Sequence, residues 1–351
     1  MQPLARKEGW PLVNLQYLDA AKLKDFLQSL SASAEVFVPK SVGDRTAWQR
    51  LASGAEYRTT AARVEHPLKG FFFPAQERVG SYPSGGEAEP AAPNRVIVGA
   101  KACDLVALRT YDKVFGEGEV VDDFYLAKRR NTTIIAADCP EPLESCGCSL
   151  LGGKPYSEDG FDLCLSEVEG GFVIEAGSAK GEKLLGGASG LSGASEAQKS
   201  QRKASREAAA ERLERINAGL HLSASRQELV RRSDRDDQWR DGVSSCVECG
   251  ACLFACPTCY CFLLHDYPRE GGGGERAKAW DACIYGGYHQ MAGGGSPRAD
   301  LLKRFRNRWM HKFDYFVDAF GFESCSGCGR CLSGCPGGID LRKVLKSMEG
   351  V

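Results

Sequence analysis

The sequence has no excess charge of either sign and no long apolar run, and each absence removes a class of function. Its 351 residues include 45 basic and 46 acidic side chains, for a formal net charge of -1. Such a balance gives no support for binding nucleic acid or an anionic membrane surface. No apolar stretch approaches the roughly 18 residues that a membrane helix needs. We therefore expect no membrane span and no nucleic-acid partner.

Signals for export and for nucleotide binding are also missing. Lys7, Glu8 and Asn14 interrupt the first 18 residues, so these residues lack the apolar core of a signal peptide, and we expect a cytoplasmic protein. No Gly-x-Gly-x-x-Gly lies between an expected strand and an expected helix, and no Gly-Lys-Ser/Thr loop occurs. The sequence also lacks the paired carboxylates and the His-x-Glu pattern that would indicate a hydrolase. We expect no catalytic residues in this chain.

Cysteine, by contrast, is abundant. The chain has 16 cysteines, of which 11 lie after residue 245. In a chain without an export signal, a disulfide scaffold is not expected, because the cytoplasm keeps thiols reduced. The cysteines are therefore expected to be metal ligands or small buried apolar residues, and their spacing decides which.

Residues 1–230 alternate expected helices with expected strands. A helix is predicted at Tyr17–Leu30, and strands are predicted at Val36–Val38, Phe71–Phe73, Val96–Val98, Thr132–Ala136 and Phe172–Glu175. This alternation predicts a sheet covered by helices. Gly80–Asn94 and Gly186–Ser195 are expected loops, and a charged helix near Glu196–Asn217 leads toward the second domain.

We expect an α+β protein with two domains. A mixed α/β domain with inserted loops is predicted for residues 1–235, and a helical ferredoxin-like domain that carries two clusters is predicted for residues 236–351.

One pattern occurs twice in the second domain. Its two copies are Cys246-x2-Cys249-Gly250-x-Cys252-x3-Cys256-Pro257 and Cys325-x2-Cys328-Gly329-x-Cys331-x3-Cys335-Pro336. Three cysteines in a tight loop bring three sulfurs to one 4Fe-4S cluster, and the fourth reaches the other cluster in two-cluster proteins. Glycine suits the sharp bend, and proline fixes the chain that leaves the loop.

This spacing predicts two 4Fe-4S clusters with crossed ligands. The first is held by Cys246, Cys249, Cys252 and Cys335, and the second by Cys325, Cys328, Cys331 and Cys256. The alternatives are zinc sites or structural cysteines. Zinc favours pairs of cysteines separated by a longer loop rather than four cysteines in an eleven-residue run.

The two copies are separated by 68 residues between Cys256 and Cys325, and this insert contains the best-defined helix of the chain, Leu301–Phe320. The gap predicts that helices surround the cluster pair. One face of this helix is basic, with Lys303, Arg304, Arg306, Arg308 and Lys312. We expect a solvated face, with a docking surface for a partner as the alternative. His311 is expected to form a hydrogen bond or to lie at the surface.

The other cysteines allow more than one interpretation. Cys259, Cys261 and Cys283 either pack beside the clusters, tune them or bind an extra metal. Four others form a possible third metal or cluster site if the strands before Cys103 and Cys139 are neighbours: Cys103, Cys139, Cys146 and Cys148. A redox-active thiol pair and plain structural cysteines are the alternatives. Cys164 is expected to be a buried strand residue.

Motifs along most of the chain resemble one family. They are Lys69-Gly-Phe-Phe-Phe-Pro74 with Glu77, Val98-Gly-Ala-Lys-Ala-Cys103-Asp104-Leu105, Asp123-Phe-Tyr125, Cys139 with Cys146-Gly-Cys148, Cys256-Pro-Thr-Cys259-Tyr-Cys261-Phe262, Trp280-Asp-Ala-Cys283 and Arg308-x-x-His311-Lys-Phe313. The chain resembles the iron–sulfur beta subunit of cytoplasmic sulfhydrogenases and the corresponding iron–sulfur subunit of anaerobic sulfite reductase. It departs from the family at Gly80–Asn94 and Gly186–Ala210, which look like local expansions.

The resemblance implies a subunit that relays electrons in anaerobic metabolism. A neighbouring subunit would bind FAD and NAD(P)H, and another would carry the catalytic centre of a hydrogenase, a sulfite reductase or a heterodisulfide-reductase-like protein. A self-sufficient oxidoreductase with a flavin or substrate site in the N-terminal domain is the alternative. A sensor or scaffold is less expected, because no DNA-recognition motif is present.

Overall fold

The computed structural model describes residues 15–43, 45–52, 57, 63–83, 90, 92–233 and 236–350. Within this part of the chain, the N-terminal half forms an eight-stranded sheet in the order β3-β2-β5-β6-β7-β8-β1-β9. Its strands are β1 (Gln16–Asp19), β2 (Glu35–Val42), β3 (Arg45–Arg50), β5 (Arg95–Ala100), β6 (Thr132–Ala137), β7 (Leu163–Val168), β8 (Gly171–Ala176) and β9 (Ser192–Gly193). β2, β5, β6 and β7 are parallel neighbours, and the outer strands are antiparallel.

Helices cover both faces of this sheet because successive residues of a strand point to opposite sides. One core packs α1 (Ala20–Leu30) and α5 (Ala179–Gly186) on residues such as Val98 and Ile135. The other packs α2 (Lys69–Phe72), α3 (Ala102–Tyr111) and α4 (Asp123–Asn131) on Ile97 and Ile134. The central parallel strands are therefore buried on both sides.

The expected strands at Val36–Val38, Val96–Val98, Thr132–Ala136 and Phe172–Glu175 are confirmed. The predicted helix Tyr17–Leu30 is confirmed over Ala20–Leu30 but not over its first three residues, and the strand predicted at Phe71–Phe73 was wrong. Residues 17–19 belong to β1, and the helix begins only at Ala20, because Asp19 caps it by accepting a hydrogen bond from the backbone N–H of Ala21. Residues 71 and 72 lie in α2, where Phe72 is buried in the core of the sheet. Residues 84–89 and 91 of the expected loop Gly80–Asn94 lie outside the described residues.

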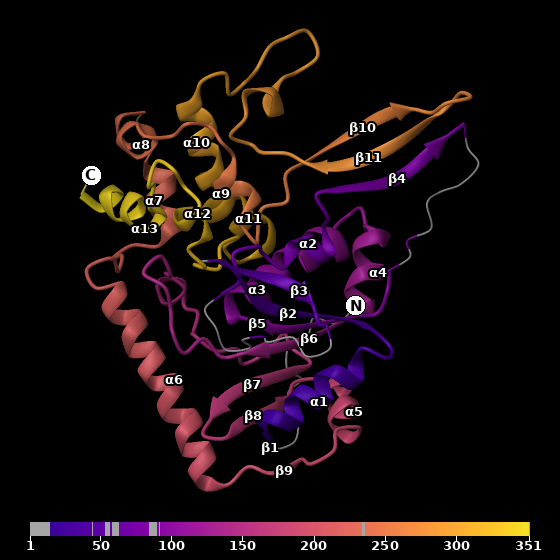
Figure 1. Ribbon diagram of the computed structural model, residues 1–351. Helices are drawn as coiled ribbons and strands as arrows, with labels where there is room; N and C mark the ends of the chain where they lie inside the picture. Colours follow the sequence, from indigo (N-terminus) through magenta and orange to yellow (C-terminus); the bar gives the residue numbers. More distant parts are fainter. Residues whose placement is uncertain are drawn as a thin grey trace.

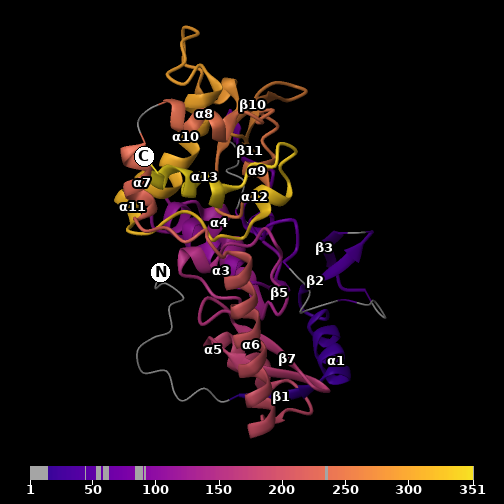
Figure 2. The same cartoon turned by 90° about the vertical axis from the view of Figure 1, so that its left-hand side faces the viewer.

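The C-terminal third is mainly helical, as predicted, and lies against one end of the sheet (Figures 1 and 2). The helix α6 (Glu196–Ile216) runs along the sheet toward this region. The helical core is formed by α7 (Arg226–Arg232), α8 (Asp236–Val243), α10 (Leu301–Met310) and α13 (Leu341–Ser347). The predicted helix Leu301–Phe320 is confirmed, with a π-helical turn at His311–Tyr315 between α10 and α11 (Phe316–Phe320). No helix among the described residues is long and apolar enough to cross a membrane.

A three-stranded antiparallel sheet links the two parts of the chain. Its strands are β4 (Gln76–Tyr82), β10 (Phe262–Pro268) and β11 (Gly274–Trp280), in the order β10-β11-β4. β10 and β11 form a hairpin in the insert between the two cysteine patterns, and the sheet projects from the body (Figure 1). The insert is therefore not wholly helical, and a strand from the N-terminal half pairs with it.

Candidate metal centre

The repeat in the sequence is also a repeat in the backbone. The short helices α9 (Ala251–Phe254) and α12 (Arg330–Ser333) each begin directly after a left-handed glycine, Gly250 or Gly329, and both glycines have φ of 72°. Two residues before each glycine the backbone is left-handed again, with φ of 55° at Glu248 and 62° at Gly327. α9 and α12 contact each other, so the two loops lie together.

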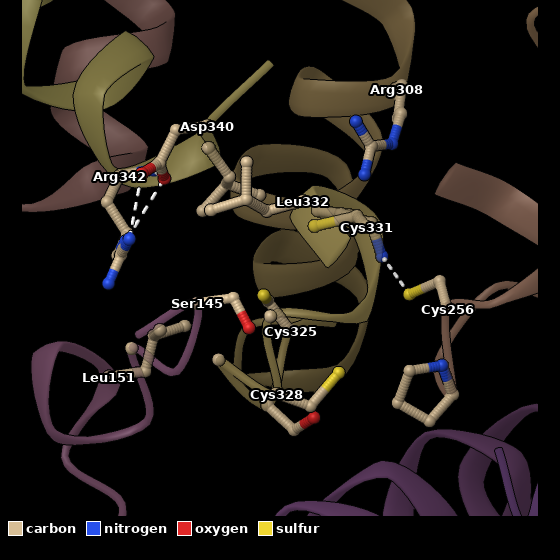
Figure 3. Close-up of a pocket in the computed structure, with 17 residues that line it drawn as sticks. Ser145, Leu151, Cys256, Arg308, Cys325, Cys328, Cys331, Leu332, Asp340 and Arg342 are labelled. Carbon is tan, nitrogen blue, oxygen red and sulfur yellow. Dashed lines mark hydrogen bonds and ion pairs between the residues drawn. The ribbon is translucent and has the colours of Figure 1, made fainter. Parts of the chain in front are cut away.

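Two cavities lie beside these loops, and each is lined by three cysteines of one loop and the last cysteine of the other. The first cavity is lined by Cys246, Cys249, Cys252 and Cys335. The second cavity is lined by Cys325, Cys328, Cys331 and Cys256 (Figure 3). Cys331 also lines the first cavity. The structure thus brings the cysteines together in two crossed groups, while their role as ligands stays a prediction.

Arg308 lines both cavities. Its side chain is 5% exposed, and its Nε and Nη2 atoms have no hydrogen-bond partner among the described residues. A buried guanidinium is costly unless an anion lies beside it. A 4Fe-4S cluster held by four thiolates is such an anion. The surroundings of Arg308 therefore fit a pair of clusters.

Lys312 provides a second buried cation at the second cavity. Its Nζ donates hydrogen bonds to Cys256 Sγ at 3.3 Å, to Thr258 Oγ1 at 2.9 Å and to the Ser324 carbonyl at 3.0 Å. Burial alone would lower the pKa of Lys312, but the neighbouring cysteines, Cys256 first, raise it above its ordinary value. Lys312 therefore stays charged and favours a thiolate at Cys256.

Most other cysteine thiols of the second cavity are neutral by themselves. Burial raises the pKa of Cys325 to about 12 and that of Cys331 to about 11. A metal that binds them must displace their protons. Among the described residues, no three or more His, Cys, Asp or Glu side chains are arranged to hold a single metal ion. Instead, the cysteines surround cavities.

The loop after β6 closes one side of the second cavity. The backbone N–H of Gly147 donates to the Gly327 carbonyl at 2.8 Å. A Cβ atom on Gly327 would lie 2.5 Å from the Gly147 carbonyl oxygen, so a side chain is excluded there. Glu248 occupies the same place in the first loop, where its side chain forms an ion pair with Arg304 at 2.7 Å. The two loops therefore share a conformation but not their surroundings.

Arg330 and Lys69 attach the N-terminal half to the two loops. Arg330 Nη2 pairs with Asp104 of α3 at 2.8 Å, and both side chains are 1% exposed. Lys69 Nζ donates to the carbonyls of Leu253 at 3.0 Å and Cys259 at 3.1 Å. Removing one partner of a buried ion pair is strongly destabilising, so these contacts fix the loops against the sheet.

A third cavity collects the four cysteines that follow the central strands. β5 and β6 are parallel neighbours, which is the condition for the four thiols to meet. The cysteines that follow these strands, namely Cys103, Cys139, Cys146 and Cys148, all line one cavity. Arg63, Lys101 and Cys328 line the same cavity. The sequence prediction that these thiols lie at one end of the sheet is confirmed, and what they bind stays a prediction.

The remaining cysteines lie in packed surroundings. Cys283 is buried in the helical core, and Cys259 and Cys261 pack against it. A hydrogen bond from Cys283 lowers the pKa of Cys261 to about 6. Cys164 is 1% exposed on β7, which confirms the predicted buried strand position.

The expected solvated face of the helix at residues 301–320 was wrong in part. Arg304, Arg308 and Lys312 are at most 5% exposed and face the cysteine loops or their supports. Their four-residue spacing places them on one stripe of the helix, and this spacing is the feature of the sequence that could have indicated a shared environment. His311 forms a hydrogen bond with the Tyr260 hydroxyl at 3.0 Å, which is the first of the two roles expected for it.

Comparison with known proteins agrees with this geometry. Residues 245–339 match the family described as 4Fe-4S dicluster domain, and this span contains all eight cysteines of the two loops. Over 326 residues the chain is 26% identical to Sulfhydrogenase 2 subunit beta of Pyrococcus furiosus, a match that covers 93% of this chain and 95% of that protein. The chain is therefore similar to an iron–sulfur beta subunit, and this similarity extends over the N-terminal sheet as well as the dicluster domain.

Proposed function

We propose that this chain is the electron-transfer subunit of a multi-subunit cytoplasmic oxidoreductase. It relays electrons through two 4Fe-4S clusters between a partner that binds FAD and NAD(P)H and a catalytic redox subunit of the hydrogenase, sulfite reductase or heterodisulfide-reductase-like class. The observation that carries the proposal is that the cysteines form two crossed groups around two cavities, and that the buried Arg308 lines both cavities. The relative's name, which makes it a subunit of a sulfhydrogenase, supports a hetero-oligomer.

The chain's own residues bind and stabilise the clusters rather than react. The four cysteines of each cavity are the proposed ligands, and each bound cluster takes up and gives back one electron at a time. Arg308 and Lys312 offset the negative charge of the thiolates. We assign this work to residues 236–351 and a supporting role to the α/β domain of residues 1–235, although β4 pairs across this boundary.

The two cavities differ in their access to the surface. Cys249 is exposed at the first cavity, and the adjacent Val247 is 66% exposed. Cys328 of the second cavity is 7% exposed and lies against the N-terminal half. Electron transfer between proteins requires a short approach, so one partner docks at residues 246–250 in this proposal.

The crossed assignment has a direct test. In the full chain, purified anaerobically, Cys335→Ser should remove the same electron paramagnetic resonance signal as Cys249→Ser, although Cys335 belongs to the other loop. Cys256→Ser should likewise match Cys325→Ser. Each variant should lose roughly four irons, and the control Cys164→Ala should lose none. If Cys335→Ser instead matches Cys325→Ser, the ligands are not crossed.

A second candidate function has one observation in its favour. A cavity of about 620 Å³ in the N-terminal half is lined by five basic side chains, four acidic side chains and Phe161, and its size suits an organic ligand. Its basic residues are Arg109, Lys113, Arg129, Arg130 and Lys180. A flavin or substrate bound here would make the chain a self-sufficient oxidoreductase.

Purification without partners separates the two functions. A relay subunit should release no flavin and should not pass electrons from NAD(P)H to a viologen dye until its co-purifying partners are added. Bound flavin together with NAD(P)H-dependent viologen reduction by the isolated chain would replace the first proposal with the second.

A further inference from the structure

The third cavity has its own set of possible ligands outside the two repeated loops. Cys103 and Cys139 follow the adjacent parallel strands β5 and β6, so both start from the same edge of the sheet. The loop after β6 returns Cys146 and Cys148 to this edge. Cys146 is 7% exposed, and the other three are partly buried. Four thiols from three separate places in the chain thus line one enclosed space.

Two cations lie among these thiols. Arg63 is 4% exposed and lines the cavity. Its Nη2 donates to Ser333 Oγ at 2.8 Å and to Ser145 Oγ at 3.2 Å, whereas its Nε has no partner among the described residues. Lys101 is 2% exposed and donates from Nζ to the Asp138 carbonyl at 2.8 Å. A buried donor without a partner, beside four thiols, indicates that an anion belongs there.

The surroundings argue against a single metal ion. Zinc bound at about 2.3 Å by each thiolate would require the four sulfurs to meet around one point. The described residues contain no such arrangement of three or more ligands, here or at the two repeated loops. The third cavity resembles the other two instead, with four cysteines around a space and a buried guanidinium beside them.

The third cavity also adjoins the second. Cys328 and Gly327 line both of them. The Gly147–Gly327 backbone hydrogen bond joins the two loops at this point, and Gly147 lies between Cys146 and Cys148 in the chain. Because Arg308 and Cys331 connect the first cavity to the second, the three cavities form a row from residues 246–250 to the edge of the sheet.

We propose that Cys103, Cys139, Cys146 and Cys148 hold a third 4Fe-4S cluster, with Arg63 and Lys101 as its charge partners. The site goes beyond the two clusters of the proposed function. It gives the α/β domain a place in the row of redox centres, in addition to its role as a support.

Iron content decides this proposal without any substitution. The full chain, purified anaerobically and reconstituted with iron and sulfide, should hold roughly twelve irons per chain and show three cluster signals in Mössbauer and electron paramagnetic resonance spectra. Roughly eight irons would overturn the third site and leave the proposed function intact. Roughly four or fewer would contradict the proposed function as well.

A double variant locates the third cluster. Cys146→Ser with Cys148→Ser should lower the iron content to roughly eight and remove one signal, while the signals of the other two clusters remain. The control Cys164→Ala removes a buried cysteine of the same sheet that does not line the cavity, and it should keep roughly twelve. Zinc or a disulfide at these four cysteines in the unsubstituted chain would also overturn the proposal. If the double variant fails to fold, the iron count of the unsubstituted chain still decides.

Discussion

At the scale of the residue, the most informative side chains are buried cations. Lys69, Arg308, Lys312 and Arg330 are each at most 5% exposed, although lysine and arginine are seldom buried without an anionic or hydrogen-bonding partner. Each contacts a cysteine loop or a cavity beside it. Their positions indicate that the protein compensates a concentration of negative charge at this place.

Substituting Lys312 tests this compensation. Lys312→Met should lower the reduction potential of the second cluster by roughly tens of millivolts, because a nearby positive charge favours the more negative reduced state. The measurement is a redox titration followed by electron paramagnetic resonance. Lys303→Met, on the exposed side of the same helix, should leave the potential unchanged. Equal shifts in the two variants would show that Lys312 has no specific effect.

Spacing made the cysteines predictable, but the cations were not. Eight cysteines in two identical patterns predicted two groups, because their geometry is local to each loop. Lys69 and Arg63 reach the loops from more than a hundred residues away in the sequence, so no local pattern could indicate them. The sequence shows Lys312 as part of a basic stripe on a helix, but a charged stripe usually faces solvent, so burial of Lys312 was not predicted.

At the scale of the element, glycine sets how closely two segments approach. Gly329 and Gly338 both have left-handed backbones, with φ of 72° and 64°. A Cβ on Gly329 would lie 2.1 Å from the Ser145 carbonyl oxygen, whereas one on Gly338 would meet no atom of the described residues within 4 Å. An alanine at position 338 therefore measures only the cost of the left-handed backbone, whereas an alanine at position 329 adds the cost of a collision with Ser145.

Alanine substitutions at these two positions should differ. Gly338→Ala should lower the free energy of unfolding by about 1–2 kcal/mol, the cost of a left-handed alanine. Gly329→Ala should cost more than this and should lose the iron of the second cluster, because the loop must move away from Ser145. Denaturant unfolding under anaerobic conditions and iron analysis measure both effects. Similar losses in the two variants would contradict the close packing described here.

The long charged helix and the strands rich in β-branched residues were predicted well, but the short aromatic run Phe71–Phe73 was not. The helix at Glu196–Ile216 and the strands β5 and β6 agree closely with the sequence prediction. The run Phe71–Phe73 looked like a strand, but the chain forms α2 there, since a run of three apolar residues has no clear period. The hairpin of β10 and β11 was missed because β10 is largely exposed and lacks an alternating apolar pattern.

At the scale of the whole molecule, the row of cavities has one end at the surface. Val247 beside Cys249 is 66% exposed, while the other cavities adjoin the sheet. If a partner docks at residues 246–250, Val247→Asp should slow electron transfer to that partner severalfold without loss of iron, because a charge at a contact surface mainly changes association.

Stopped-flow mixing of the reduced chain with its co-purified partner measures this rate. Val120→Asp makes the same change at a valine that is 83% exposed elsewhere, so it serves as the matched control. Equal rates for the two variants would place the contact on another surface.

The pairing of β4 with β11 has a consequence for how the chain is made. β4 leaves the ribosome long before β11 has been synthesised, and until then the edge of β4 that β11 later covers has no partner. A nascent chain in this state is open to association with other chains, so its maturation depends on the hairpin closing soon after synthesis. Genetic separation of the dicluster domain would recreate this open edge permanently, and the two fragments would have to be produced together to yield a well-behaved protein.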